Sequence, residues 1–343
     1  MKDHENMQAI ILNGFGGVEH FSAATLPLPE PGDTEVLVQI AATAFNPIDY
    51  QMRQGAPESK RMHSPVLGRE CAGIVIKAGK LVRGFAPGDP VMAASGSMGS
   101  NGSYATHISL PAEILVHKPH NISFAEAAAV PTASLTALQC YKRLQLPASA
   151  SIFISGAAGG VGLVLVKLLV AAGYTDVTAT AGNEASREQL LLAGLTAEQI
   201  IDYRQPELVA TILEHHNGRK FDAVIDLVGG HLSEICAEIL LTNGIYQDVT
   251  ALTTETARAT LFNKGTVIVN ISNYAYSLDG NLSYYGDGLR QIAALLEKGT
   301  ITPSPVYVTG AFSVETVQQS HLLLERNQSR GRKLVMTVLS DIH

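Results

Sequence analysis

Cysteine is scarce in this chain. Its 343 residues include three cysteines, Cys71, Cys140 and Cys236, which lie far apart and form no CxxC pair. Small secreted proteins held together by disulfides carry an even number of cysteines at short spacings. The odd and sparse set found here indicates reduced thiols in a reducing compartment and argues against a disulfide framework.

Basic runs and long apolar runs are also missing. Lys and Arg number 24 against 31 Asp and Glu, which gives a net charge of −7, and this balance argues against nucleic acid or an anionic membrane as the main partner. No apolar stretch reaches the roughly 18 to 20 residues that a membrane-spanning helix needs. The opening residues MKDHENMQAI lack the apolar core of a signal peptide. We therefore expect a soluble cytoplasmic protein.

The chain does contain enough apolar material for more than one core. Hydrophobic residues make up 46% of the sequence and charged residues 16%, which is typical of a well-buried globular enzyme. A length of 343 residues is too great for one ordinary core. We therefore expect two domains.

Residues 1–125 are rich in short apolar runs separated by Gly and Pro. Period-two alternation and β-branched residues in these runs predict strands, and the stretches LPLPEPGD and GFAPGD have the composition of turns. These features predict a mostly β domain over residues 1–125.

The pattern changes near Ser123, which stands three residues before Glu126 in the spacing of a helix capping box. Strand-like and helix-like runs then alternate, which predicts a parallel sheet with helices on both faces. Six runs are strand-like, the number of a full dinucleotide-binding sheet: SIFIS, DVTAT, IIDY, FDAVIDLV, GIYQDV and GTVIVNI. We predict an α/β fold with a doubly wound, six-stranded Rossmann domain over 126–271 and a return to the first domain over 272–343.

A glycine-rich loop, SGAAGGVG, joins the first of these strands to a helix. Its Gly156, Gly159 and Gly162 have the context of a dinucleotide fingerprint, in which the glycines permit a tight turn, a close approach to a diphosphate and close helix packing. The diphosphate would lie at the helix N-terminus, against the turn of residues 156–162. The alternative is a purely structural turn. The predicted contacts in this loop are Gly156, Ala158, Gly159, Gly160, Val161 and Gly162.

The end of the second strand favours NADPH over NADH. NAD-binding proteins usually carry an acid there for the ribose 2′-hydroxyl, whereas Thr180, Ala181 and Gly182 stand at this place. Ser186 and Arg187 follow, and Tyr203 ends the third strand, so Gly182, Ser186, Arg187 and Tyr203 are candidates for holding a 2′-phosphate. Two alternatives remain, since Arg187 can be a solvated helix residue and Glu184 can reach a ribose.

Five stretches together resemble the medium-chain dehydrogenase/reductase superfamily, and specifically its zinc-free, zeta-crystallin-like quinone oxidoreductase branch. The stretches are SGAAGGVG (155–162), PTASLTAL (131–138), FNPIDYQMRQG (45–55), VLGRECAGIVIKAG (66–79) and GFAPGDPVMA (84–93). The NPIDYQMR segment resembles the enone and alkenal reductases of that branch. The resemblance covers nearly the whole chain. It implies a GroES-like β domain interrupted by an NADP-binding domain, and a homodimer joined through edge strands, here 265–271.

The resemblance also shows where zinc-dependent members of the superfamily hold their metal. This chain has Asn46 at the first ligand position, Arg69 at the second and Pro131–Thr132 near the third. Arginine stays protonated and has no lone pair to donate, and a catalytic zinc needs three protein ligands. The stretch AASGSMGSNGSYATH replaces the four-cysteine structural lobe. We therefore expect no metal, and expect Glu70 to pair with Arg69 or another base.

The active-site loop of the resembled family falls on residues 46–51, so the resemblance implies Asn46, Tyr50 and Gln51 as catalytic candidates. Tyr50 can donate to the substrate oxygen or belong to the core. Relatives often carry Lys where Gln51 stands, which leaves solvent as an alternative proton source. Asp49 is expected to bond backbone amides, and Arg53 is a candidate for replacing the missing positive charge.

The remaining candidates for cofactor binding come from strand ends and from the resemblance. Strand ends at a topological switch point line the ligand crevice, which favours the segment after FDAVID. The resemblance implies contacts of Thr132 and Thr136 with the nicotinamide end, although a helical Thr can merely bond its own helix. The full set is Thr132, Thr136, Val228, Gly229, Gly244, Ser272 and Lys333.

Loss of zinc changes the chemistry that is within reach. Without a Lewis acid a simple ketone is hard to polarise, whereas a quinone or an enone can accept hydride with its charge delocalised onto oxygen. We therefore expect an NADPH-dependent oxidoreductase acting on a small-molecule quinone or α,β-unsaturated carbonyl. The alternatives are a zinc-independent dehydrogenase of another carbonyl or alcohol, and a non-catalytic NADPH-binding sensor or scaffold.

Overall fold

The computed structural model describes residues 6–98 and 102–339. The chain divides into two compact units, one formed by residues 1–135 and 274–343 and the other by residues 136–273. The long helix α3 (Pro131–Leu144) starts in the first unit and continues in the second. Within the described ranges, no helix has the length and apolarity that a bilayer crossing requires.

The unit of residues 136–273 is built on six parallel strands, which confirms the predicted Rossmann sheet. The strands lie in the order β10-β9-β8-β11-β12-β13, so the chain starts in the middle and winds outward in both directions. Their bounds are β8 Ile152–Ser155, β9 Val177–Ala181, β10 Ile200–Asp202, β11 Phe221–Asp226, β12 Leu240–Asp248 and β13 Val267–Asn270. The central strand β8 is buried throughout, as expected for a parallel sheet covered on both faces.

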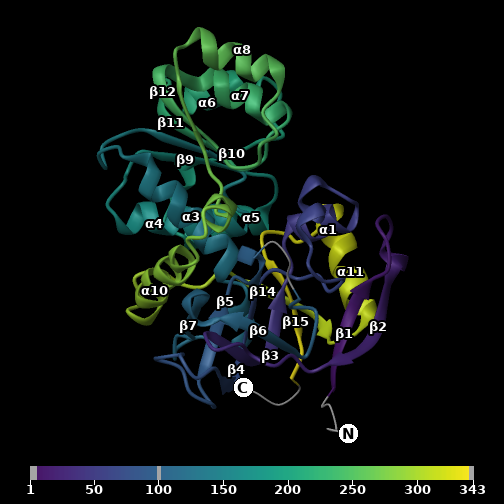
Figure 1. The fold of residues 1–343 in the computed structure, drawn as a ribbon. Helices are drawn as coiled ribbons and strands as arrows, with labels where there is room; N and C mark the ends of the chain where they lie inside the picture. Colours follow the sequence, from purple (N-terminus) through teal and green to yellow (C-terminus); the bar gives the residue numbers. More distant parts are fainter. Residues whose placement is uncertain (1–5, 99–101, 340–343) are drawn as a thin grey trace, which may run out of the picture. The chain divides into compact units, whose positions relative to one another are not determined.

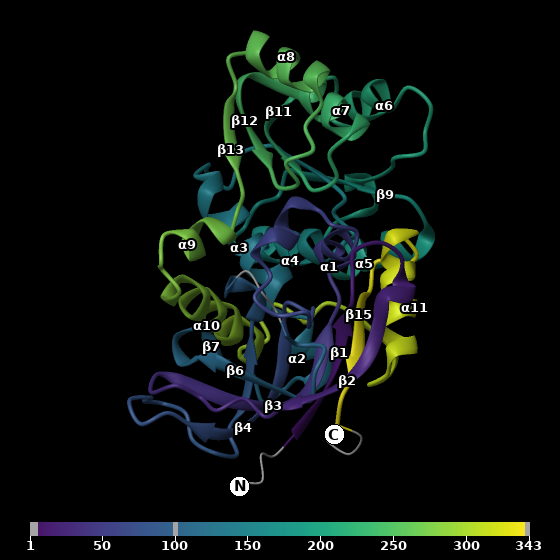
Figure 2. The same cartoon turned by 45° about the vertical axis from the view of Figure 1, so that its right-hand side comes forward.

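Helices cover both faces of this sheet (Figure 1 and Figure 2). Helices α4 (Gly160–Ala171) and α5 (Glu184–Leu192) lie on one face. On the other face lie α6 (Leu208–His215), α7 (His231–Ile239) and α8 (Glu255–Asn263). One apolar core cluster joins α6, α7 and α8 to the strands β8, β11 and β12. This packing fixes the carboxyl ends of the strands, where the glycine loop is carried.

The other unit is mostly β. Its main sheet has the order β14-β15-β3-β4-β5-β7, with β6 paired to β3, and a separate hairpin is formed by β1 and β2. Strand β15 pairs antiparallel with β3, so the end of the chain enters the sheet that its beginning forms. The strands are β1 Asn6–Leu12, β2 Phe21–Pro27, β3 Glu35–Ala44, β4 Cys71–Ala78, β5 Pro90–Ala93, β6 His107–Pro111, β7 Leu115–His117, β14 Val306–Ala311 and β15 Lys333–Thr337.

Helices and short 3₁₀ turns connect these strands. The predicted capping box is confirmed at the start of α2, where Ser123 Oγ accepts from the main-chain N–H of Glu126 and the Glu126 carboxylate accepts from the main-chain N–H of Ser123. The helices of this unit are α1 Pro47–Arg53, α2 Phe124–Ala128, α9 Tyr274–Leu278, α10 Ser283–Glu297 and α11 Val314–Glu325. Helix α1 directly follows β3, which places the predicted active-site loop at the end of a central strand.

Candidate active site

The glycine loop turns sharply between β8 and α4. Gly156 has φ +66°, a conformation that side chains other than glycine rarely adopt, and a Cβ there would lie 2.7 Å from Val228 Cγ2. A Cβ on Gly162 would lie 2.4 Å from the carbonyl oxygen of Ala157. At Gly159 the nearest atom to such a Cβ is 3.2 Å away. Close packing therefore explains why positions 156 and 162 are glycine, whereas the backbone at Gly159 has more space around it.

The loop leaves the N-terminus of α4 available to an anion. The helix starts at Gly160, and its N-cap Gly159 has extended backbone and no side chain that could cap the helix. The first N–H groups of a helix have no carbonyl partner within it and lie at the positive end of the helix dipole. The main chain around Gly160, Val161 and Gly162 can therefore hold a phosphate, with Ala158 buried in the preceding turn.

A buried carboxylate holds the turn that follows β11. Asp226 accepts hydrogen bonds from Ser155 Oγ at 2.7 Å, from Tyr246 Oη at 2.7 Å, and from the main-chain N–H groups of Val228 and Gly229. The contact of Gly156 with Val228 brings this turn to the glycine loop. Asp226 was missed as a site residue, although an acid that ends an apolar strand run is a signal that could have identified it.

The four candidates near the end of β9 differ in what surrounds them. Gly182 and Tyr203 are adjacent, since a Cβ on Gly182 would lie 2.3 Å from the Tyr203 hydroxyl oxygen. Ser186 is buried, and its N–H donates to the side chain of the N-cap of α5. The Arg187 guanidinium donates to the main-chain carbonyl oxygens of Ile200 and Ala197. The structure therefore turns the Arg187 guanidinium toward the chain that leads into β10.

Three further candidates in the unit of residues 136–273 are placed by hydrogen bonds or packing. Thr136 Oγ1 accepts from Asn273 Nδ2 at 2.9 Å, and the carbonyl oxygen of the neighbouring Ser272 accepts from Gln139. Gly244 differs, because a Cβ there would lie 3.0 Å from the carbonyl oxygen of Asp222, near the start of β11. Gly244 thus lies at the amino-terminal end of the strands, away from the glycine loop.

The unit of residues 1–135 and 274–343 contains a buried polar network around Glu70. Lys333 Nζ donates to Glu70 Oε1 and to Asn46 Oδ1, both at 2.7 Å. Asn46 Nδ2 also donates to Glu70 Oε1, and the main-chain N–H of Thr132 donates to Glu70 Oε2. The base that pairs with Glu70 is therefore Lys333. The network brings together three predicted site residues and Glu70, which sequence reasoning considered only as a pairing partner.

Helix α1 presents the other predicted catalytic residues. Asp49 is fully buried and accepts from the main-chain N–H of Asn46 at 2.8 Å, which confirms the expected structural bond. Burial raises the pKa of Asp49 to about 7. Tyr50 and Gln51 are half-buried on this helix. Arg53 is buried and paired with Glu325 at 2.7 Å, so its charge is already compensated.

The side chains at the metal positions do not fit zinc. Arg69 donates to the carbonyl oxygen of Gly96 and to the Met52 sulfur, and a guanidinium has no lone pair for a metal. The Lys333 ammonium bonds the oxygens of Asn46 and Glu70 that a cation would need. Across residues 6–98 and 102–339 no three His, Cys, Asp or Glu side chains form a metal-binding group; residues 99–101, within the stretch that replaces the cysteine lobe, lie outside these ranges.

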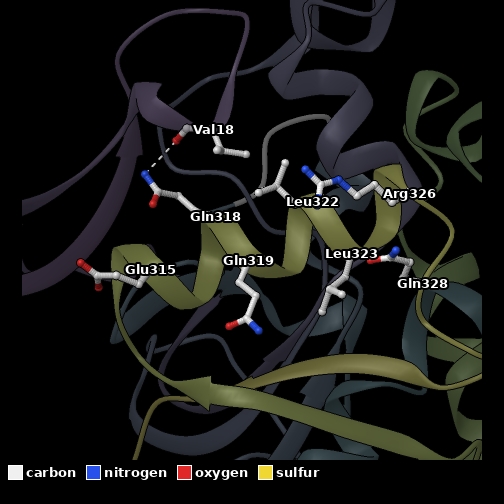
Figure 3. A pocket seen from close by; sticks show the side chains of 8 residues that line it. All are labelled: Val18, Glu315, Gln318, Gln319, Leu322, Leu323, Arg326 and Gln328. Atoms are coloured by element: carbon white, nitrogen blue, oxygen red, sulfur yellow. Dashed lines mark hydrogen bonds between the residues drawn. The ribbon is translucent and has the colours of Figure 1, made fainter.

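A separate hollow of about 500 Å³ lies along α11 (Figure 3). The figure shows Gln318 donating to the main-chain carbonyl of Val18 at its rim, a bond of 3.0 Å. Its lining residues are Val18, Glu315, Gln318, Gln319, Leu322, Leu323, Arg326 and Gln328. None of the predicted site residues is among them, so this hollow is distinct from the Glu70 network.

Comparison with known proteins agrees with this geometry. Residues 32–120 match the family model of the alcohol dehydrogenase GroES-like domain, and residues 195–335 match the model described as zinc-binding dehydrogenase. The chain is 36% identical over 228 residues to a chloroplastic quinone oxidoreductase of Triphysaria versicolor, covering 64% of this chain and 67% of the relative. It is 29% identical to an NADPH-dependent alkenal/one oxidoreductase of Arabidopsis thaliana, covering 97% and 80%.

Solved structures show the same relationship. The quinone oxidoreductase of Escherichia coli, determined in complex with NADPH, superimposes with a TM-score of 0.82 at 25% identity and covers 96% of this chain and 99% of its own. The quinone oxidoreductase of Coxiella burnetii gives a TM-score of 0.84 at 27% identity, covering 98% and 100%. With its GroES-like and Rossmann folds, the chain belongs to the quinone oxidoreductase branch of the medium-chain dehydrogenase/reductase superfamily.

Proposed function

We propose that this protein is an NADPH-dependent reductase of quinones or α,β-unsaturated carbonyls that works without zinc. The observation that carries the proposal is the Lys333–Glu70–Asn46 network, in which an ammonium group bonds Asn46, the residue at the first metal position of a dehydrogenase fold. Relatives named for quinone and alkenal/one reduction support the substrate class. A conjugated acceptor suits such a site because its charge delocalises without help from a Lewis acid.

The residues that would hold NADPH come from the glycine loop and the neighbouring strand ends. The main-chain N–H groups of 158–162 would bind the diphosphate at the N-terminus of α4. The turn at Val228 and Gly229, held by Asp226, would lie along the ribose. Thr136 and Ser272 would contact the nicotinamide end. When bound, NADPH supplies the hydride for the reduction.

A preference for NADPH over NADH follows from the end of β9. No acid stands at residues 180–182 to repel a 2′-phosphate. Gly182, Ser186 and Tyr203 would surround that phosphate. Arg187 would have to exchange its bonds with the carbonyls of Ile200 and Ala197 for phosphate oxygens, a favourable exchange for a guanidinium because the new bonds are charge-assisted.

The side chains of α1 would position the acceptor. Tyr50 is half-buried and has a hydroxyl that can donate to a carbonyl oxygen. Gln51 is half-buried and offers an amide donor. Asn46 is held rigidly by Glu70 and Lys333, so it fixes the start of the helix. After hydride addition, water would deliver the proton that completes the reduction.

The homodimer that we propose would form through the edge strand β13. This strand ends the six-stranded sheet, and Val267 and Ile268 on it are 54% and 49% exposed. An unpaired edge with exposed apolar side chains is a template for pairing with a second strand, here β13 of a second copy. We also infer a cytoplasmic location, since all three cysteines are free and buried.

The experiment that tests the function is a turnover assay with purified protein. NADPH oxidation is followed with a panel of enones, enals and quinones, in parallel with NADH. The proposal predicts turnover of at least one conjugated acceptor, with a higher kcat/KM for NADPH. Turnover of unconjugated ketones alone would favour the alternative dehydrogenase. Tight NADPH binding without turnover of any acceptor would favour a sensor or scaffold.

A further inference from the structure

We propose that Arg69 binds the carbonyl oxygen of the substrate and stabilises the negative charge that develops on it during reduction. This inference deepens the proposed function and rests on it. It assigns to Arg69 the part that a Lewis acid plays in the zinc-dependent enzymes. The sequence presented this residue as the loss of a metal ligand and as a partner for Glu70.

The Glu70 carboxylate does not compensate the charge of Arg69. Arg69 precedes Glu70 in the chain, so an ion pair between neighbours would be the simplest use of both. The structure shows instead that Glu70 is fully used by Lys333, Asn46 and the main-chain N–H of Thr132. The carboxylate beside Arg69 is therefore committed to a different cation.

The Arg69 guanidinium makes two hydrogen bonds. Its Nη2 donates to the carbonyl oxygen of Gly96 at 3.0 Å, and its Nη1 donates to the Met52 sulfur at 3.4 Å. A thioether is a weak acceptor, and a guanidinium has five N–H donors. Among the described residues Arg69 has no carboxylate within ion-pair distance. Most of its donor capacity and all of its charge are thus left for another partner.

A ligand in solvent has access to the Arg69 side chain. Arg69 is half-buried, so part of its side chain is in contact with solvent. Within the described ranges no acceptor bonds its Nε, which packs against Gly96. A partly buried charge interacts more strongly with a ligand than a fully solvated charge does, because less water screens it. A small ligand can therefore reach a donor whose charge the protein does not neutralise.

The ionisable groups near Arg69 set the local charge. Asp49 on α1 is close enough for Arg69 to lower its pKa, although burial outweighs this effect and keeps the carboxyl largely protonated below pH 7. Burial raises the pKa of Tyr285 on α10 to about 12, and the positive charge of Arg69 offsets part of this increase. Lys333 adds a second positive charge, which is paired with Glu70. With Asp49 protonated, Arg69, Lys333 and Glu70 together carry a net positive charge. Such a charge stabilises a substrate oxygen that becomes negative.

The chemistry uses this charge at one step. With NADPH bound as the hydride donor, hydride would add to the β-carbon of the enone, the C=C π pair would form a new double bond between the α-carbon and the carbonyl carbon, and the C=O π pair would move onto oxygen. The products of this step would be NADP⁺ and an enolate, and water would then protonate the α-carbon and leave hydroxide. Arg69 would hold the oxygen through its free N–H donors as the charge forms, in the manner of an oxyanion hole.

The kinetic test uses Arg69→Met with Arg83→Met as the matched control. Arg83 lies in the same unit, and its guanidinium is likewise held by main-chain carbonyls, those of Lys80 and Val82. Arg69→Met should lower kcat for 2-cyclohexenone by about 100-fold, with a smaller loss for 1,4-benzoquinone, whose charge spreads over a ring. Arg83→Met should stay within threefold of the wild type. Equal losses in both variants, or no loss in Arg69→Met, would overturn the inference.

Binding of a phenolate tests the role of Arg69 without any turnover of substrate. 4-Nitrophenol carries its charge on one oxygen when ionised, and its phenolate is coloured, so titration by absorbance reports the pKa of the bound phenol. The wild type should lower that pKa by about 1 unit or more relative to Arg69→Met. An unchanged pKa would contradict the inference even if the enzyme is active. If the wild type reduces no enone or quinone, the proposed function fails and this titration alone decides the role of Arg69.

Two further measurements separate loss of the charge from loss of the fold. Arg69→Lys keeps the charge but lacks the planar fork, so it should retain more activity than Arg69→Met and less than the wild type. Guanidinium ion added to Arg69→Ala should restore part of its activity and have no effect on Arg83→Ala. Failure of both the lysine variant and guanidinium to recover activity, in protein that melts like the wild type, would contradict the proposal.

Discussion

Lys333 Nζ lies 2.7 Å from Glu70 Oε1, and the two side chains are 7% and 0% exposed. This ion pair ties the last strand of the chain, β15, to the residue that precedes β4. Removing one partner of a buried pair leaves an uncompensated charge in a medium that solvates it poorly. The pair therefore holds the site together only while both members are present.

Lys333→Met should strongly destabilise the protein for this reason. We expect a loss of about 3 to 5 kcal/mol in the free energy of unfolding, measured by urea denaturation. The control is Lys77→Met, which removes an exposed ion pair with Glu30 and should cost about 0 to 1 kcal/mol. If both variants lost the same free energy of unfolding, the buried ion pair would matter no more to stability than an exposed one.

Asp49 and His321 should give stability opposite dependences on pH. Burial raises the pKa of Asp49 to about 7 and lowers the pKa of His321 to about 3. Between about pH 4 and 7 the Asp49 carboxyl is protonated in the folded state but not in the unfolded state. The contribution of Asp49 to the free energy of unfolding therefore decreases as pH rises. Between about pH 3 and 6.5 the imidazole of His321 is protonated in the unfolded state but not in the folded state. The contribution of His321 to the free energy of unfolding therefore increases as pH rises.

Single substitutions should separate these two terms. In Asp49→Asn the stability should rise between pH 4 and 6.5, and in His321→Gln it should fall over the same range, by up to about 1.4 kcal/mol per pH unit in each case. Urea midpoints across this range measure both slopes. Parallel slopes in the two variants would contradict the assignment.

The two ends of the glycine loop should respond differently to an added methyl group. Gly162→Ala places a Cβ 2.4 Å from a main-chain carbonyl and should lower the free energy of unfolding by about 1 to 3 kcal/mol. Gly159→Ala meets its nearest atom at 3.2 Å, so the fold should be largely kept while NADPH affinity falls, because this glycine lets the diphosphate approach. Unfolding curves and calorimetric titration with NADPH distinguish the two outcomes. Unchanged NADPH affinity in Gly159→Ala would argue that the loop is only a structural turn.

A lysine on β13 should abolish the proposed dimer. Ile268→Lys introduces a charge on the exposed edge of the six-stranded sheet, where like charges from two copies would face each other. The control is Val308→Lys on β14, the edge strand of the other main sheet, which is also exposed. Light scattering should show one chain per particle for Ile268→Lys and two for the control. A monomeric wild type, or an Ile268→Lys variant that is still dimeric, would contradict dimerisation through β13.

The parts of the fold that the sequence predicted correctly are those with local signals. The six strands of the Rossmann sheet alternate with helices at short range, and the capping box at Ser123 and Glu126 needs four consecutive residues. The glycine loop has a fixed spacing within eight residues. In each case the physical cause and the sequence pattern lie within one segment, so the pattern is sufficient.

The features that the sequence did not predict depend on contacts between distant segments. Lys333 and Glu70 are separated by 263 positions, and nothing local says that they meet. The direction of the Arg187 guanidinium depends on the chain that leads into β10, and the place of Gly244 depends on the register of β12 against β11. Sequence spacing assigns such residues to a strand end or a helix, but the tertiary packing decides which way they face.

The central claim is hydride transfer from NADPH to a conjugated acceptor without zinc, and isotope labelling tests it most directly. Protein stripped with a chelator is incubated with an enone and NADPH deuterated at the transferring position of the nicotinamide, and the product is analysed by mass spectrometry and NMR. The account predicts a saturated carbonyl compound with one deuterium on the β-carbon, formed at the same rate before and after stripping. Deuterium on the carbonyl carbon, or activity that returns only when zinc is added, would contradict it.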